Sequence, residues 1–124
     1  MPDSDRLHHG KELDQLRSVW VKKHHENQLM VGGSINTFTV VNLRKEAQEW
    51  LTRLSKSYNT VVFDMEPSNP EGTVCVSFIL CLYRHAEKLK LTLEFINVPD
   101  QILRIVQLSG LTDILQLASS KKRT

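Results

Sequence analysis

The order strand, helix, strand in the middle of the chain is the strongest constraint on its fold. Residues 61–63 form a continuous apolar run, typical of a strand that is buried on both faces or lies in the middle of a sheet. Residues 67–70 contain two prolines, which forbid regular structure there, and a helix can then run over residues 71–90. Residues 91–98 alternate as in another strand. This order predicts parallel strands joined by a right-handed crossover.

The segments before this unit predict a hairpin and an amphipathic helix. Residues 19–21 and 29–31 are short β-type runs on either side of a polar stretch, which favours an antiparallel hairpin. Asn36, Thr37 and Thr39 offer caps for a helix whose apolar residues recur at helical spacing. Those apolar residues are Val40, Leu43, Ala47, Trp50, Leu51 and Leu54. One face of this helix is therefore expected to be buried.

The C-terminal part predicts one more helix. Pro99 opens it, Ser109 and Gly110 break its pattern, and residues 111–117 are expected to add one or two further turns. The whole order is then β-β-α-β-α-β-α. It predicts an α/β domain with a small mixed sheet of four or five strands and helices packed against it.

The length of 124 residues suits one domain. Residues 1–16 have only Leu7, Leu13 and Leu16 to bury, and we expect a mobile N-terminal arm there. Residues 17–118 form the expected domain. Residues 119–124 form a basic tail, which is more often solvated than bound to phosphate.

Composition argues against several classes of function. A formal net charge of +2 is too small to indicate nucleic-acid binding. The longest apolar run, residues 74–83, is broken by Ser77 and is about half the length needed to cross a bilayer. The charged, His-rich start does not resemble a signal peptide. We therefore expect a cytoplasmic protein without direct membrane insertion, and Cys75 and Cys81, too far apart for a disulfide, suit a reducing compartment.

The histidines do not predict a metal site, a cofactor site or a catalytic centre. They occur as His8-His9, His24-His25 and a lone His85, with no cysteine or clustered carboxylate at ligand spacing. Adjacent histidines in extended backbone point in opposite directions. We expect His85 to be a partly buried side chain on the sheet-facing side of its helix, with its hydrogen bonds satisfied.

The helix over residues 71–90 carries the candidate functional surface. At about 100° per residue, one side is wide enough to cover the sheet. It holds Val74, Cys75, Phe78, Leu82, His85, Ala86 and Leu89. The opposite side is apolar where a solvated helix should be charged, so we define a candidate partner surface on it. Its members are Thr73, Val76, Ser77, Leu80, Tyr83 and Arg84.

Two alternatives remain open for this surface. The terminal helices could fold over the apolar residues and bury them as core. Thr73 could also serve as the N-cap of its helix, where its oxygen would accept a backbone N–H bond. That role is compatible with a contact to a partner, because a hydroxyl at the rim of an apolar face also offers a hydrogen bond.

Several of these features together resemble the STAS family, the domain of sulfate transporters and anti-sigma-factor antagonists. They are the strand at Trp20, Gly33-Ser34-Ile35 at the end of the second strand, Gly72-Thr73 at the start of the helix, and LTLEFINVPDQILRIVQLSGLTDIL over residues 91–115. The resemblance covers residues 17 to about 117. Within the family, the sequence is most similar to the small STAS subunit of Mla-type ABC transporters, which maintain outer-membrane lipid asymmetry in Gram-negative bacteria.

The resemblance implies a protein that binds partners and catalyses nothing. In the transporter branch, a threonine at the position of Thr73 helps to hold the ATPase, so the resemblance implies an accessory subunit on the inner face of the inner membrane. In the antagonist branch, the partner is an anti-sigma factor or kinase, which phosphorylates the second serine of an Asp-Ser-Ser-Gly motif. Here Gly72 stands in place of that Asp, Thr73 matches the first serine, and Val74 replaces the phosphorylated one.

Overall fold

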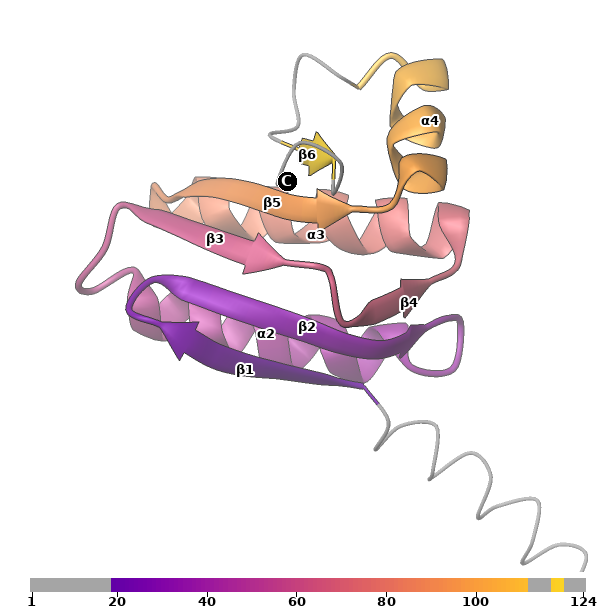
Figure 1. Cartoon of the computed structure of the whole chain (residues 1–124). Helices are drawn as coiled ribbons and strands as arrows, with labels where there is room; N and C mark the ends of the chain where they lie inside the picture. Colours follow the sequence, from indigo (N-terminus) through magenta and orange to yellow (C-terminus); the bar gives the residue numbers. More distant parts are fainter. Residues whose placement is uncertain (1–18, 112–116, 120–124) are drawn as a thin grey trace, which may run out of the picture.

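The computed structural model describes residues 19–111 and 117–119. Its elements are β1 (Trp20–His25), β2 (Gln28–Ile35), α2 (Val40–Leu54), β3 (Thr60–Asp64), β4 (Ser68–Pro70), α3 (Gly72–Leu89), β5 (Thr92–Val98), α4 (Asp100–Leu108) and β6 (Leu117–Ser119). The strands run in the order β1-β2-β3-β5-β6, and the short β4 pairs with β2 beside this path (Figure 1). The predicted mixed α/β fold is confirmed.

The sheet combines one antiparallel pair with parallel neighbours. β1 and β2 form the predicted antiparallel hairpin, while the pairs β2–β3, β3–β5 and β5–β6 are parallel. At one end of the hairpin the Trp20 ring lies over Gly32, where an added Cβ would come within 2.0 Å of that ring. A side chain at position 32 would therefore displace the Trp20 ring. β1 is an edge strand whose last four residues are exposed.

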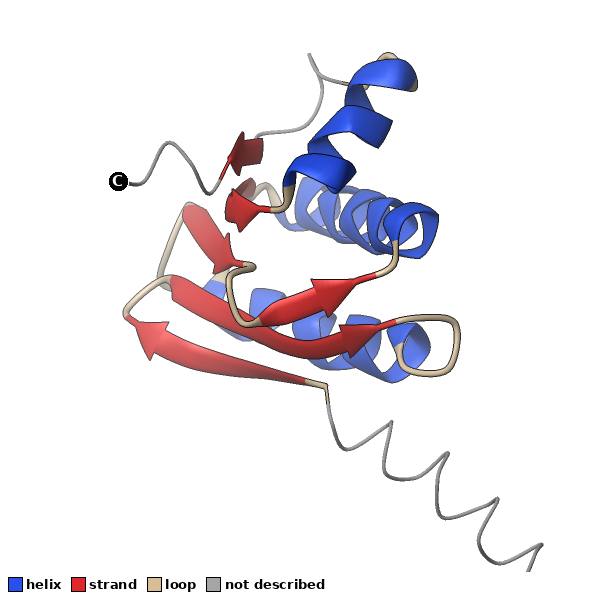
Figure 2. Ribbon diagram, turned by 45° about the vertical axis from the view of Figure 1, so that its right-hand side comes forward, coloured by secondary structure: helices blue, strands red, loops and turns tan. Residues whose placement is uncertain are grey.

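Two helices cover one face of the sheet. Figures 1 and 2 show α2 and α3 side by side on that face, with α4 beyond the end of β5 and next to α3. The core lies between this helix layer and the sheet, where Phe63 of β3 stacks on Phe95 of β5 with 5.0 Å between ring centroids. Both phenylalanines are fully buried. In the central strand β3, Val61 is fully buried and Val62 only partly, because α2 and α3 cover a single face.

Two predictions about local structure were wrong. Residues 67–70 are not irregular throughout, since β4 (Ser68–Pro70) pairs with the end of β2 from Gly33 to Ile35. Proline is tolerated in a short strand of this kind because a strand with one neighbour leaves some N–H groups unused. Leu117, expected to end a helical turn, belongs to β6 and lies in a parallel pair with β5.

Parts of the predicted organisation lie outside the described residues. They include the arm over residues 1–16, residues 112–116, and the tail except Ser119, which ends β6. Across the described ranges, no helix combines the length and the apolar character that a membrane span requires.

Candidate partner-binding site

The N-terminus of α3 is fixed by backbone contacts rather than by a capping side chain. Glu71 is the N-cap residue, makes no side-chain cap hydrogen bond, and donates its N–H to the Ile35 carbonyl oxygen at 2.9 Å. Gly72 then opens the helix, where an added Cβ would come within 2.6 Å of Ile105 Cδ1 on α4. The start of α3 is thus held between the end of β2 and α4.

Thr73 is not the N-cap, so that interpretation is wrong. It is the second residue of α3, its side chain is exposed, and it makes no hydrogen bond within the part of the chain that is described. The capping position falls two residues earlier because the helix already begins at Gly72. The Thr73 hydroxyl therefore remains available at the positive end of a helix dipole.

The structure divides the candidate partner surface into two groups. Thr73, Ser77 and Arg84 are exposed along the outward side of α3. Leu80 is half-buried, and Val76 is 7% exposed and belongs to the core. Only the polar members of the surface therefore lie fully on the solvent side.

Val76 and Tyr83 do not lie on an open helix face. The Tyr83 hydroxyl donates to the Leu93 carbonyl oxygen at 3.1 Å, and its ring centroid lies 5.8 Å from that of Phe95. Gly72 shares this side of α3 and meets α4 through Ile105. Val76 thus lies in the core on the side of α3 that meets α4, whereas β5, and not a terminal helix, contacts Tyr83.

His85 lies toward α2 rather than toward the sheet. Its Nε2 is 3.1 Å from the Thr52 Oγ1, and the side chain is half-buried. The expectation of a partly buried histidine with a hydrogen-bond partner is confirmed, but the expected direction is wrong. Within residues 19–111 and 117–119, no group of three or more His, Cys, Asp or Glu side chains is placed to hold a metal ion.

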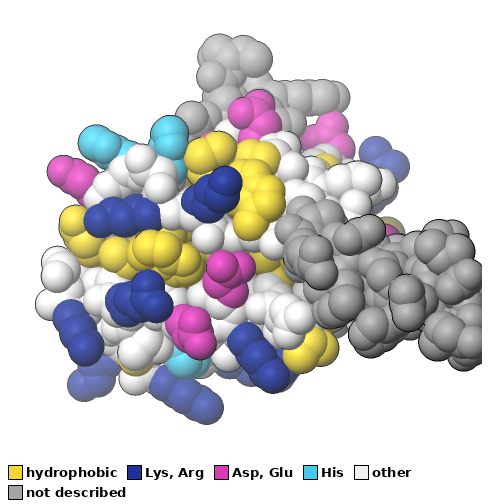
Figure 3. Space-filling model, turned by 90° about the horizontal axis from the view of Figure 1, so that it is seen from below, with side chains coloured by type: hydrophobic (Ala, Val, Ile, Leu, Met, Phe, Trp, Pro, Cys, Tyr) yellow, Lys and Arg dark blue, Asp and Glu magenta, His cyan; other side chains and the backbone are white. Residues whose placement is uncertain are grey.

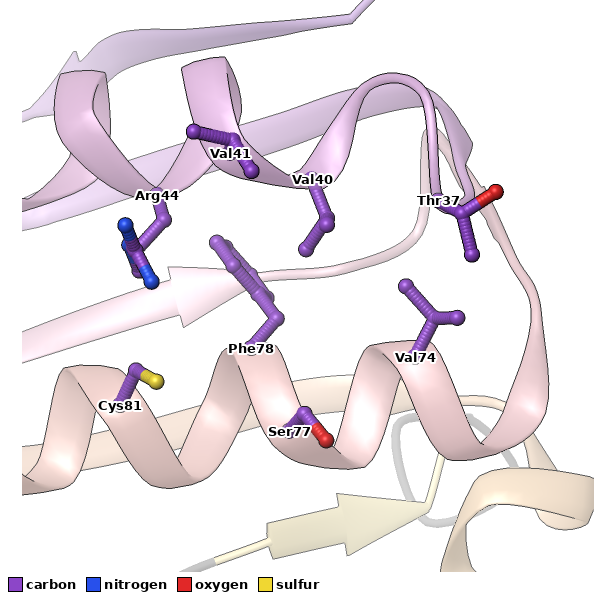
Figure 4. Close-up of a pocket in the computed structure, with 8 residues that line it drawn as sticks. All are labelled: Thr37, Val40, Val41, Arg44, Val74, Ser77, Phe78 and Cys81. Atoms are coloured by element: carbon purple, nitrogen blue, oxygen red, sulfur yellow. The ribbon is translucent and has the colours of Figure 1, made fainter.

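A hollow of about 280 Å³ opens between the N-terminal halves of α2 and α3 (Figure 4). We name it the α2–α3 groove. Its lining residues are Thr37, Val40, Val41, Arg44, Val74, Ser77, Phe78 and Cys81. Figure 4 shows Val40 on α2 and Val74 on α3 pointing toward one another, with Phe78 beside them. Ser77 belongs both to this groove and to the candidate partner surface.

Two exposed apolar residues near the start of α2 were missed from the sequence. Phe38 is 59% exposed and Val41 is 46% exposed. An apolar residue just before a helix N-cap is typical of a hydrophobic staple, which would have predicted a buried Phe38. Its position between the polar residues Thr37 and Thr39 was the only sequence signal against burial.

The loop that carries Phe38 is held by hydrogen bonds. Asn36 Oδ1 accepts from the N–H groups of Phe38 and Thr39 at 2.9 and 3.2 Å. The buried Thr39 hydroxyl donates to the Ser34 carbonyl oxygen at 2.7 Å and accepts from the Asn36 N–H at 3.0 Å. Phe38 is therefore presented to solvent from a fixed backbone.

Comparison with known proteins identifies the family. The STAS domain family matches residues 19–123, nearly the whole domain. The chain belongs to the STAS domain family. STAS domains generally serve as regulatory or accessory domains. No curated protein matches the sequence.

Solved structures share the STAS fold at low sequence identity. The anti-sigma factor antagonist SpoIIAA in its unphosphorylated form has a TM-score of 0.61 at 14% identity, over 85% of this chain and 91% of that one. The phosphorylated form of SpoIIAA from Bacillus has a TM-score of 0.59 at 14% identity, over 85% and 95%. An anti-sigma factor antagonist from Mycobacterium paratuberculosis has a TM-score of 0.57 at 21% identity, over 81% and 83%. These similarities establish the fold.

The two cysteines of the STAS domain are free and should differ strongly in reactivity. Burial raises the pKa of the Cys75 thiol to about 12, whereas Cys81 is half-buried and lines the α2–α3 groove. Because the thiolate is the reactive form, we expect iodoacetamide at pH 8 to alkylate Cys81 at least about a hundredfold faster than Cys75. Intact-mass spectrometry should show one adduct on the folded protein and two in denaturant. Two adducts at equal rates under native conditions would contradict the burial of Cys75.

Proposed function

We propose that this STAS domain is a non-catalytic accessory subunit that binds and stabilises the ATPase of an Mla-type ABC transporter. Such a transporter moves phospholipids and supports lipid asymmetry of the outer membrane. The threonine at position 73 supports this branch, while the sequence resemblance over residues 91–115 supports the family as a whole. In this proposal the protein is cytoplasmic and reaches the inner face of the inner membrane through its partner. It uses no cofactor and binds no nucleic acid.

The observation that carries the proposal is that the Thr73 hydroxyl makes no hydrogen bond within the described residues. A side chain that neither caps the helix nor bonds elsewhere in the described structure is free to bond a partner. Ser77 follows it one turn later, and both are exposed. Polar groups at the edge of an apolar groove fix the orientation of a bound partner, while apolar contacts supply most of the affinity.

The members of the candidate partner surface take different roles in this proposal. Thr73, Ser77 and Arg84 contact the ATPase directly, and Leu80 lies at the edge of the contact. Val76 and Tyr83 do not contact the ATPase in this proposal, but they hold α3 in place against α4 and β5. Binding to the folded ATPase stabilises it by mass action, which needs no chemistry from the STAS domain.

A second candidate is a regulator that resembles an anti-sigma-factor antagonist. The similarity in fold to SpoIIAA favours it. The partner would then be an anti-sigma factor or a kinase-like protein. Val74 at the position of the phosphorylated serine makes a phosphorylation switch there impossible, so binding would have to be regulated in another way.

We expect Thr73→Glu to weaken ATPase binding by about 2 kcal/mol, roughly thirtyfold in affinity, because it places a charge and extra bulk in the contact. The isolated domain should melt at the same temperature or slightly higher, since a negative charge at a helix N-terminus is favourable. The measurement is affinity purification of tagged wild-type and variant chains from the native host, with melts followed by circular dichroism.

Thr92→Glu provides the matched control, because Thr92 is exposed at the start of β5 and is not part of the candidate partner surface. Equal recovery of the ATPase with Thr73→Glu and wild type would overturn the role of Thr73. Recovery of an anti-sigma or kinase-like protein, and not of an ABC ATPase, would favour the second candidate.

A further inference from the structure

We infer that the α2–α3 groove binds an amphipathic helix of the partner protein, which places two apolar side chains in the groove and an acidic side chain against Arg44. The inference rests on the partner-binding part of the proposed function and does not depend on the partner being an ATPase.

The inner end of the groove has the composition of a site for apolar side chains. Val40 and Val74 face each other across it, and Phe78, only 1% exposed, lies beside them (Figure 4). The walls come from two helices that are already packed together on the sheet. The groove is thus preformed, and an apolar side chain entering it would bury surface without first ordering its walls.

The segment that leads into α2 adds exposed apolar side chains. Phe38 is 59% exposed on a loop held by Asn36 and Thr39, and Val41 is 46% exposed on the first turn of α2. Exposed aromatic residues that are fixed in place lose little entropy on binding and are enriched among interface hot spots. Val41 lines the groove, and Phe38 follows Thr37, which also lines it. Two large exposed apolar residues in this segment indicate a macromolecular partner rather than a small ligand.

Charge defines the other end of the groove. Arg44 lines it, and within the described residues Arg44 has no carboxylate partner. A second hollow of about 500 Å³ lies further along α2. That hollow is lined by Lys45, Gln48, Glu49, Thr52, Arg53 and His85. Its lining holds two fixed cations and one carboxylate, so with Arg44 the excess is positive.

The surface around α2 carries charges of both signs. Figure 3 shows the side of the molecule formed by β1 and α2, where Lys and Arg side chains lie on both sides of a band of apolar atoms and Asp and Glu side chains lie among them. The positive excess therefore comes from the residues that line the two hollows. A segment that is apolar at one end and acidic at the other therefore complements the groove. Acidic groups near this basic end would also raise the rate of association.

The length of α2 beside the two hollows favours a helix as the occupant. Their linings extend along α2 from Val40 to Arg53, over which its backbone rises about 20 Å, the length of a helix of about 13 residues. Val40 and Arg44 are one helical turn apart, so a partner helix can match them with an apolar residue and an acidic residue at the same spacing. A third helix lying along two packed helices is a common recognition mode.

The probe for this inference is a synthetic helical peptide of about 14 residues with two leucines one turn apart and glutamates one and two turns further on. Its twin carries lysine in place of each glutamate. We expect the glutamate peptide to bind the full chain at least about tenfold more tightly than its twin, as fluorescence anisotropy measures. It should also slow alkylation of Cys81, which lines the groove.

Two variants make the test specific. Arg44→Glu should reverse the preference between the two peptides. Val41→Asp should lower the affinity of both peptides by about tenfold or more. Arg104→Glu on α4 is the matched control for charge, because Arg104 is exposed and lies outside the groove. Circular-dichroism melts of each variant verify that it is folded.

Several results would overturn the inference. They are peptide binding without protection of Cys81, no charge preference, or a preference that Arg44→Glu does not change. A chain that dimerises in sedimentation, and loses the dimer with Val41→Asp, would assign the groove to a second copy. Peptide binding seen only after deletion of residues 1–16 would assign the groove to the chain's own N-terminal segment.

The inference and the proposed function fail in different ways. One outcome is that an ABC ATPase is recovered and that Thr73→Glu abolishes its binding, while Val41→Asp and Arg44→Glu leave its binding unchanged. In that case the partner helix does not bind in the groove. If the peptide binds with the expected charge preference but no ABC ATPase is recovered, the groove assignment stands and the ATPase assignment fails.

Discussion

Val76→Asp is expected to destabilise the protein by about 3 kcal/mol or more, whereas Ser77→Asp, one residue further along α3, should change stability by less than about 0.5 kcal/mol. Val76 is 7% exposed and lies in the core, while Ser77 is exposed. A carboxylate at position 76 would be buried without a partner, and a carboxylate at position 77 would remain hydrated.

Thermal melts of the two aspartate variants test this directly. For a domain of this size, the loss at Val76 should lower the melting temperature by roughly 10 °C or more. Because both substitutions introduce the same side chain into the same helix, a difference in helix propensity cannot account for the result. Equal melting temperatures would place Val76 on an open surface, as the helical pattern of the sequence first suggested.

Phe95→Ala should destabilise the protein by about 3–5 kcal/mol, because truncation of a buried aromatic ring leaves a cavity that its neighbours fill only in part. The Phe95 ring is fully buried, stacks on Phe63 at 5.0 Å, and lies 5.8 Å from the Tyr83 ring. The cavity lies beneath α3, so the truncation also loosens Tyr83, which helps to fix that helix to the sheet. Urea unfolding of the variant and the wild type measures the loss.

The control for this truncation is Phe38→Ala, because Phe38 is 59% exposed. Its removal should change the free energy of unfolding little, within about 0.5 kcal/mol, while weakening a partner that occupies the groove. A Phe38→Ala variant as unstable as Phe95→Ala would show that Phe38 is part of the core and not an anchor for a partner.

The order of the elements was predictable because each depends on a local pattern. The period of Val40, Leu43 and Ala47 indicates α2 without any knowledge of its neighbours. The strand β4 left no such pattern, since its three residues become a strand only through pairing with β2. The sequence of one segment alone does not predict which distant segment it pairs with.

The candidate site was predictable only in part for a related reason. Helical spacing separates Val76 and Tyr83 from Phe78, but it cannot say which neighbour covers each side. Tyr83 contacts β5, the side of α3 that holds Gly72 and Val76 meets α4, and Phe78 lies in the groove next to α2. The polar residues of the surface are exposed, since burial of a polar side chain without a partner is unfavourable. Phe38 was missed because its exposure depends on the hydrogen-bonded loop that carries it.

The exposed edge strand β1 determines how a partner can approach this protein. Within the described residues β1 pairs only with β2, so its outer edge offers backbone groups that a foreign strand could join. Lys22, Lys23, His24 and His25 occupy that edge, and all four are exposed. Adding a strand there would crowd these side chains and desolvate the two lysines, which guards against edge-to-edge aggregation. Recognition through backbone pairing is thereby disfavoured, and specific association is left to side chains on the helical layer.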